Sequence, residues 1–418
     1  MKPTRILLAL ILWPVVVLAG PPEPLAASES VADSLWTRDK LTGDWGGLCT
    51  SLAGHGVDID LQYTGITQGM LSGTGDEDFD FGGRADLLLG LDTGRLGLWK
   101  GGGFHFHVTQ RHGDLPGSRG GALWPVNTAG VLPLDGLDNF VASSIYFTQR
   151  LGDSASMLIG KINAVDLLAR DPFFGGWGIH RFMNLAFVAP PSGVFPPVIM
   201  GAVFNYTVKP VTFTFMVYDP NDRTNDYWPD DLFSDGVNLA LSATWRGEIA
   251  GRASSIGIGG KYSTKEGVDL SDVVLPPGLA AGTKEGSYNI ALDFSHLLYE
   301  SRAVPGKGLG IYGKAAIADG NPNPIQGSFS GGLAGHGVVP GRPRDVFGIG
   351  YFYYNFSDDL QDALAPLVRF DDEQGVEVFY NLAATPWFRV SADVQWIDPA
   401  AGANDHAWLF ALRANLSF

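Results

Sequence analysis

The chain has 418 residues, of which 45% are hydrophobic, and its formal net charge is −16. This strong acidity argues against nucleic acid as a partner. Cys49 is the sole cysteine, which excludes an intrachain disulfide and a cysteine-rich metal site. The length suits either two or three soluble domains or one large barrel.

Residues 1–27 are predicted to form a secretory signal peptide. Lys2 and Arg5 supply a positively charged start, residues 6–18 are apolar, and small residues follow at 17–19 and again at 26–28. Such a segment is too short to span a bilayer, and cleavage at either group of small residues fits the pattern. No cysteine lies nearby, so a lipoprotein anchor is not expected. The mature chain is therefore expected to be exported.

No later stretch has the pattern of a transmembrane helix. The longest uncharged run, 182–208, contains Pro190, Pro191, Pro196 and Pro197, which exclude a continuous helix. A closed barrel is the other structure that satisfies every backbone polar group in lipid. An exported, apolar chain without a spanning helix therefore favours a barrel.

Residues 28–56 are expected to form a periplasmic segment that contains a short helix. Asp44 can cap this helix, Leu48 and Leu52 share one of its faces, and Gly56 can end it. The remaining residues, 57–418, are assigned to a transmembrane β-barrel. This division gives a leader, a short N-terminal segment and one barrel domain.

Residues alternate between apolar and polar in many segments of the barrel region, as strands with one lipid-facing side and one wet side require. In the last strand, Trp408, Phe410 and Leu412 alternate with Ala411 and Arg413. The pattern predicts an all-β, antiparallel barrel of about 16 strands, an even number as in bacterial single-chain barrels. The expected strands start near residues 57, 79, 102, 139, 155, 198, 211, 236, 254, 286, 307, 326, 344, 374, 388 and 405.

The connections between these strands alternate between short and long. Short ones fall at 152–154, 209–210 and 384–387, and the long ones are 112–138, 165–197, 219–235, 266–285 and 357–374. Outer-membrane barrels have short periplasmic turns and long extracellular loops. The connections after residues 319 and 397 are shorter than this pattern requires. A soluble β-sandwich stays open as an alternative, although it gives no reason for sorting loops by length.

Several motifs resemble the carbohydrate-selective porins of the OprB type. Residues 41–48 read LTGDWGGL and are followed by HGV at 55–57, which is similar to the opening of that family. Further similar segments are 96–102, 149–152, 160–164, 340–345, 385–387, 393–395 and 412–413. The resemblance covers nearly all residues after 38. Cys49 departs from it, because the family usually carries a basic residue there, and several outer loops are individual.

The resemblance implies a passive, sugar-selective porin in the bacterial outer membrane. Its solutes would be monosaccharides such as glucose, with disaccharides left open, and its surroundings outer-membrane lipid. It implies no cofactor and no metal. The barrel could be a monomer or a homotrimer, and neither the sugar nor the pore width follows from the sequence.

Strand parity predicts which polar side chains line the lumen. Both signs of charge occur there, which suits a neutral polar solute better than an ion. The alternative is that these charges pair with one another on a wet wall. The candidates are Arg84, Asp86, His105, His107, Arg150, Lys161, Asn163, Arg246, Lys261, Asp293, Lys314, Glu377, Arg389, Asp393 and Arg413.

The long connection at 165–197 is the first candidate for a constriction that contacts sugar. If it folds into the barrel, it brings rings and charges to the narrowest point; the alternative is a lid packed outside. The connection at 112–138 is the second candidate. The predicted sugar contacts are Arg170, Asp171, Trp177, His180 and Arg181.

Three other functions are alternatives to a sugar-selective porin. A general porin without a sugar site is the nearest. A barrel enzyme would need a Ser or Asp beside a His at the outer rim, and neither His180 nor His336 has an evident partner. A gated receptor is disfavoured because too few residues precede the first strand to form a plug domain. His105 and His107 lack a third ligand for a metal site.

Overall fold

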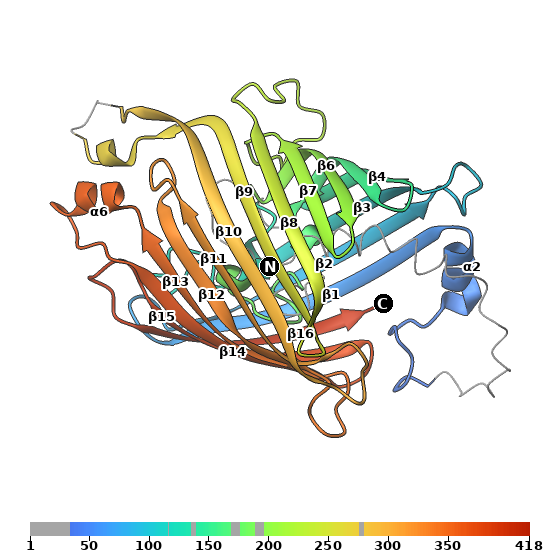
Figure 1. Cartoon of the computed structure of the whole chain (residues 1–418). Coiled ribbons are helices and arrows are strands. Elements are labelled where there is room, and N and C mark those ends of the chain that lie inside the picture. The colour runs from blue at the N-terminus through green and yellow to red at the C-terminus, as the bar shows by residue number, and fades with distance from the viewer. Residues whose placement is uncertain (1–33, 116, 135–138, 169–175, 189–195, 276–279) are drawn as a thin grey trace.

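In the computed structural model, sixteen antiparallel strands close into one barrel within the described residues, which are 34–115, 117–134, 139–168, 176–188, 196–275 and 280–418 (Figure 1). Each strand pairs with its neighbours in the chain, and β1 pairs with β16 to close the sheet. Closure leaves no unpaired strand edge. The predicted all-β barrel is therefore confirmed.

The strands have the following bounds: β1 (Val57–Ser72), β2 (Phe79–Asp92), β3 (Gly102–Gly113), β4 (Phe140–Leu151), β5 (Ala155–Asn163), β6 (Val198–Val208), β7 (Val211–Tyr218), β8 (Asn238–Ile249), β9 (Arg252–Val268), β10 (Thr283–Glu300), β11 (Gly308–Ala318), β12 (Ile325–His336), β13 (Val346–Phe356), β14 (Glu373–Ala383), β15 (Phe388–Asp398) and β16 (Ala407–Ser417). The predicted starts agree closely with these bounds. The largest difference is at β10, which begins at Thr283 instead of near 286. A register shift between Glu285 and Ser287 interrupts the alternation there, while pairing with β9 continues beyond it.

Alternating burial along the strands separates an apolar outer face from an inner face. In β16, Trp408 and Leu412 are 47% and 45% exposed, whereas Leu409, Ala411 and Arg413 are each 1% exposed. The outer residues form the kind of apolar surface that a barrel presents to lipid. The inner residues are buried because chain segments inside the barrel cover them.

Short helices occupy the N-terminal segment and some connections. They are η1 (Trp45–Gly47), α2 (Leu48–Gly54), α3 (Thr128–Val131), α4 (Ala164–Leu168), α5 (Leu185–Val188), η2 (Leu270–Asp272) and α6 (Asp358–Leu364). The predicted N-terminal helix is present, and Asp44 Oδ1 accepts a hydrogen bond from the Thr50 amide at 2.8 Å. Gly56, with φ of 87°, ends this region before β1.

The two ends of the barrel differ in the length of their connections. One end, called here the short-turn end, carries connections such as 209–210 and 250–251, and α2 lies there. The other, the long-loop end, carries 114–139, 164–197, 219–237 and 357–372, including α6 at the opposite side of Figure 1. No helix among the described residues combines the length and the apolar character needed to cross a membrane.

Candidate functional site

The described parts of two long connections fold into the barrel instead of covering its mouth. Residues 176–188, called here the inner segment, follow β5, and residues 117–134, the companion segment, follow β3. Val126, Ala129, Phe182 and Phe187 on these segments are all fully buried. Thr128 donates its amide to the Met183 carbonyl at 2.8 Å, which joins the two segments. The described residues of both connections that the sequence proposed for a constriction thus lie inside the barrel.

Aromatic rings hold the inner segment against the wall of β11, β13 and β14. Phe182 stacks on Phe187 with ring centroids 4.5 Å apart, and it meets Phe379 edge-on at 4.9 Å and Tyr312 at 5.8 Å. Gly350 lies beneath these rings. A Cβ atom added at Gly350 would stand 2.5 Å from Cε1 of Phe187, so the close packing depends on that glycine.

Gly350→Ala is expected to displace the inner segment and to destabilise its packed position by about 1–3 kcal/mol, because the new methyl group overlaps the Phe187 ring. The single-channel conductance measured in a planar bilayer would then be higher than that of the unmodified protein, or the current through the open channel would fluctuate. Gly260→Ala is the matched control, since its added Cβ meets nothing closer than 4.0 Å. Equal traces from the two variants would contradict this account of the packing.

Charged side chains of β14 and β16 bind the backbone of the inner segment. The Glu377 carboxylate accepts the amides of Met183 and Asn184 at 2.5 and 3.0 Å. Arg413 donates to the carbonyls of Gly178 and Arg181 at 2.5 and 2.7 Å, and it also pairs with Asp393 at 3.0 Å. The wall therefore fixes the inner segment through its main chain.

Other wall residues hold the companion segment in the same way. Arg84 donates to the Leu132 carbonyl at 2.7 Å, and Arg111 donates to the carbonyls of Gly130 and Pro133 at 2.5 and 2.8 Å. Gln395 contacts both segments: its amide nitrogen donates to the Val126 carbonyl at 2.9 Å, and its oxygen accepts from Asn184 at 3.1 Å. Lys314 instead holds the inner segment, because it donates to the Phe187 carbonyl at 3.3 Å. Several charges predicted to line the lumen thus have backbone partners.

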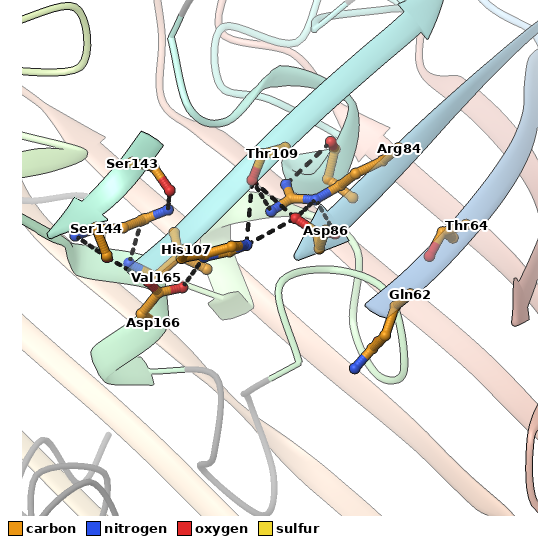
Figure 2. Close-up of polar contacts among 12 residues, drawn as sticks. Gln62, Thr64, Arg84, Asp86, His107, Thr109, Ser143, Ser144, Val165 and Asp166 are labelled. Atoms are coloured by element: carbon orange, nitrogen blue, oxygen red, sulfur yellow. Dashed lines mark hydrogen bonds and ion pairs between the residues drawn. The ribbon is translucent and has the colours of Figure 1, made fainter. Parts of the chain in front are cut away.

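His107 joins the wall to the start of the β5–β6 connection (Figure 2). Its Nε2 lies 2.8 Å from Asp86 Oδ1, and its Nδ1 lies 2.7 Å from Asp166 Oδ1 on α4. Asp86 also pairs with Arg84 at 2.7 Å, and Asp166 accepts from the Ser144 hydroxyl at 2.5 Å. The Trp177 ring lies 4.9 Å from the His107 ring, between centroids.

A cavity of about 1000 Å³ lies beside this network and reaches the N-terminal segment near α2. The wall, the inner segment and the N-terminal segment contribute rings and polar groups to its lining. Its lining includes Gln62, His105, His107, Tyr146, Asp166, Trp177 and His180, with Asp58, Asp60 and Lys40 toward the short-turn end. His105 and Tyr146 stack with their ring centroids 4.9 Å apart. A ring face next to hydrogen-bonding groups matches what a pyranose offers.

His180 is partly buried at the edge of the cavity. Burial, and then the positive charges of Arg389, Arg181 and Arg413, lower the pKa of His180 to about 3. Its Nδ1 is buried and has no hydrogen-bond partner among the described residues. The imidazole is therefore neutral at physiological pH.

The remaining candidates occupy the following positions. Arg170 and Asp171 lie outside the described residues. Trp177, His180 and Arg181 belong to the inner segment. None of the predicted lumen residues is exposed. Those that do not contact the inner or the companion segment occupy inner-face positions of their strands. They are Arg150 on β4, Lys161 and Asn163 on β5, Arg246 on β8, Lys261 on β9, Asp293 on β10 and Arg389 on β15.

The sequence reasoning passed over Tyr146, Ser144 and Gln395. Tyr146 shares strand parity with Thr148 and Arg150, so alternation could have placed it inside. Ser144 shares this parity and could have been found in the same way, whereas Ser143 could not, because a register shift between His107 and Val108 lets Ser143 and Ser144 both be buried. Within the described part of the chain, no group of three or more His, Cys, Asp or Glu residues could hold a metal ion.

Comparison with known proteins agrees with the fold. A family model described as "Carbohydrate-selective porin, OprB family" matches residues 76–418. The high-pH structure of Pseudomonas putida OprB superposes with a TM-score of 0.79 at 20% identity and covers 93% of this chain and 100% of its own. The low-pH structure of the same protein gives a TM-score of 0.59 at 16% identity, covering 92% and 99%. A loop-deletion mutant of Vibrio cholerae OmpT gives 0.51 at 14% identity, covering 87% and 99%. No protein of curated function matches the sequence.

Proposed function

Because this chain belongs to the carbohydrate-selective porin family of the OprB type, and so is an outer-membrane channel and not an enzyme, we propose that it conducts monosaccharides such as glucose by passive diffusion. Disaccharides are the larger solutes that the same path could take. The observation that carries the proposal is the inner segment, folded into the barrel beside a cavity lined by rings and polar groups. A channel of this kind must bind the sugar strongly enough to favour its entry into the lumen and weakly enough to permit its release.

We assign the sugar contacts to the face of the inner segment that borders the cavity. Trp177 and His180 line the cavity, and Arg181 follows them in the chain. An aromatic face can cover the apolar face of a pyranose, while the neutral His180 ring can hydrogen-bond a hydroxyl. Arg170 and Asp171, which precede this face in sequence, are proposed as further contacts.

The wall charges divide into two groups in this proposal. Arg84, Lys314, Glu377 and Arg413 already bind carbonyl or amide groups of the folded-in segments, so their proposed role is to keep the path narrow. His105 borders the cavity and is proposed to face the solute. Residues 1–27 are proposed to be a leader that is removed, and residues 28–56 a periplasmic segment. The barrel is proposed to act as a monomer or as a homotrimer.

The experiment is a titration of glucose, and then of a disaccharide, against single-channel current in a planar bilayer. A saturable, sugar-specific fall in current is expected. Trp177→Ala should raise the half-saturating glucose concentration by about threefold to tenfold, equivalent to about 1 kcal/mol of lost binding free energy. Current measured without sugar reports any change of aperture separately.

Trp228→Ala serves as the control, because Trp228 is 95% exposed on the connection between β7 and β8. Its half-saturating concentration should equal that of the unmodified protein. A current indifferent to every sugar would instead identify a general diffusion porin without a sugar site.

A further inference from the structure

The hydrogen bonds around His107 tie three parts of the molecule together. His107 belongs to β3, Asp86 to the neighbouring strand β2, and Asp166 to α4, the helix that begins the β5–β6 connection. The two distances from the ring nitrogens, 2.8 Å to Asp86 and 2.7 Å to Asp166, are short hydrogen bonds. His107 is 1% exposed and Asp86 is 1% exposed, so water does not screen this bridge.

The charges around the bridge are balanced. Asp86 faces Arg84 and the Thr109 hydroxyl, and Asp166 faces the Ser144 hydroxyl. An imidazole that donates to two carboxylates must carry a proton on both nitrogens, so the bonded form is a cation. Two carboxylates then meet one guanidinium and one imidazolium. Burial of each charge is tolerated because each is paired and hydrogen-bonded.

The bridge also positions the inner segment. Trp177 packs on the His107 ring at 4.9 Å, and the Arg84 guanidinium lies 5.8 Å from the Trp177 ring centroid. The amide of Val165 donates to Asn163 Oδ1 at 2.9 Å, so α4 leaves the end of β5 in a fixed direction. Losing the bridge would free both α4 and the Trp177 face from the β3 wall.

We propose that His107 is a positioning residue: bonded between Asp86 and Asp166, it holds the first part of the β5–β6 connection against the wall and so sets the aperture of the channel. The inference deepens the proposed function, because the same bridge holds the Trp177 face beside the cavity. It is tested without sugar, by ion conductance and by exclusion of neutral polymers of graded size.

His107→Ala and Asp166→Ala are each expected to raise single-channel conductance about twofold and to admit larger polymers, since the path widens. The double variant should show no more than the larger single effect, because both changes break one bridge. Asp166→Asn keeps an oxygen that can accept a hydrogen bond from His107. Its conductance should therefore lie much closer to that of the unmodified protein than to that of Asp166→Ala. Asp166 lies outside the strands, so its variants test the bridge even if His107→Ala does not fold.

His112→Ala is the matched control. His112 lies on the same strand, β3, but its Nε2 is 3.1 Å from the Tyr63 hydroxyl and its ring stacks on the Tyr63 ring instead of contacting α4. It should leave conductance and polymer cut-off unchanged. Unchanged values for both alanine variants of the bridge, or strictly additive effects, would overturn the inference. Because these measurements need no sugar, that failure is distinct from failure of the sugar titration.

Discussion

Glu377→Ala is expected to release the inner segment and to raise ion conductance severalfold. The carboxylate accepts two buried backbone amides, of Met183 and Asn184, at 2.5 and 3.0 Å. Its removal leaves both N–H groups without acceptors, and each costs about 1–3 kcal/mol. The packed position would therefore weaken by about 2–6 kcal/mol, a large fraction of the free energy that holds a folded segment. Single-channel recording without sugar measures the change directly.

Two further variants identify the cause. Glu377→Gln keeps one oxygen that can accept, so its conductance should lie between those of the unmodified protein and Glu377→Ala. Glu248→Ala removes an exposed carboxylate at the end of β8 and should have no effect. If Glu377→Ala conducts like Glu248→Ala, the inner segment does not depend on this acceptor. Heat-dependent gel mobility shows whether each variant forms a folded barrel.

Acidification is expected to loosen the inner segment through His180. The pKa of His180 is lowered from 6.5 to about 3 where the residue is packed, by burial and then by the nearby Arg389, Arg181 and Arg413. A released His180 in water would titrate near 6.5 and would bind a proton that the packed ring does not. The packed position is therefore fully stable above pH about 6.5 and loses stability as the pH falls from there toward about 3.

The loss amounts to about 1.4 kcal/mol for each pH unit below the ordinary value, or about 3 kcal/mol at pH about 4. This figure is an upper bound, because His180 keeps part of its contact with solvent. Conductance should rise progressively as the pH is lowered through this window. Recording the same channel at stepped pH values tests the expectation.

His180→Asn removes the titrating group and should flatten the rise in that window. His406→Gln is the control: His406 lies in the connection before β16 and pairs with Asp398 at 3.0 Å, remote in sequence from the inner segment. It should keep the full pH response. A response that survives in His180→Asn would assign the acid sensitivity to another group.

The strands and their two faces follow from the sequence alone. In β16, the alternation of Trp408 and Leu412 with Ala411 and Arg413 predicted both the strand and its orientation, and the burial of these residues confirms it. Alternation is a local property, because successive side chains of an extended chain point to opposite sides. It requires no knowledge of which strands pair. The local rule fails where a register shift intervenes, as at Ser143, which is buried although it has the parity of the outward-facing Ile145.

Only the tertiary structure decided the roles of the inward-facing charges. Parity placed Arg84, Glu377 and Arg413 inside the barrel, but it could not distinguish a group facing solute from a group holding a backbone. Glu377 binds an amide 194 positions away in the chain, and Arg413 a carbonyl 235 positions away. Such contacts exist only after the barrel has closed and the two long connections have folded into it. The sequence by itself therefore determined the wall, because a strand's faces depend on neighbouring residues, whereas the narrowing of the channel was decided by packing between distant ones.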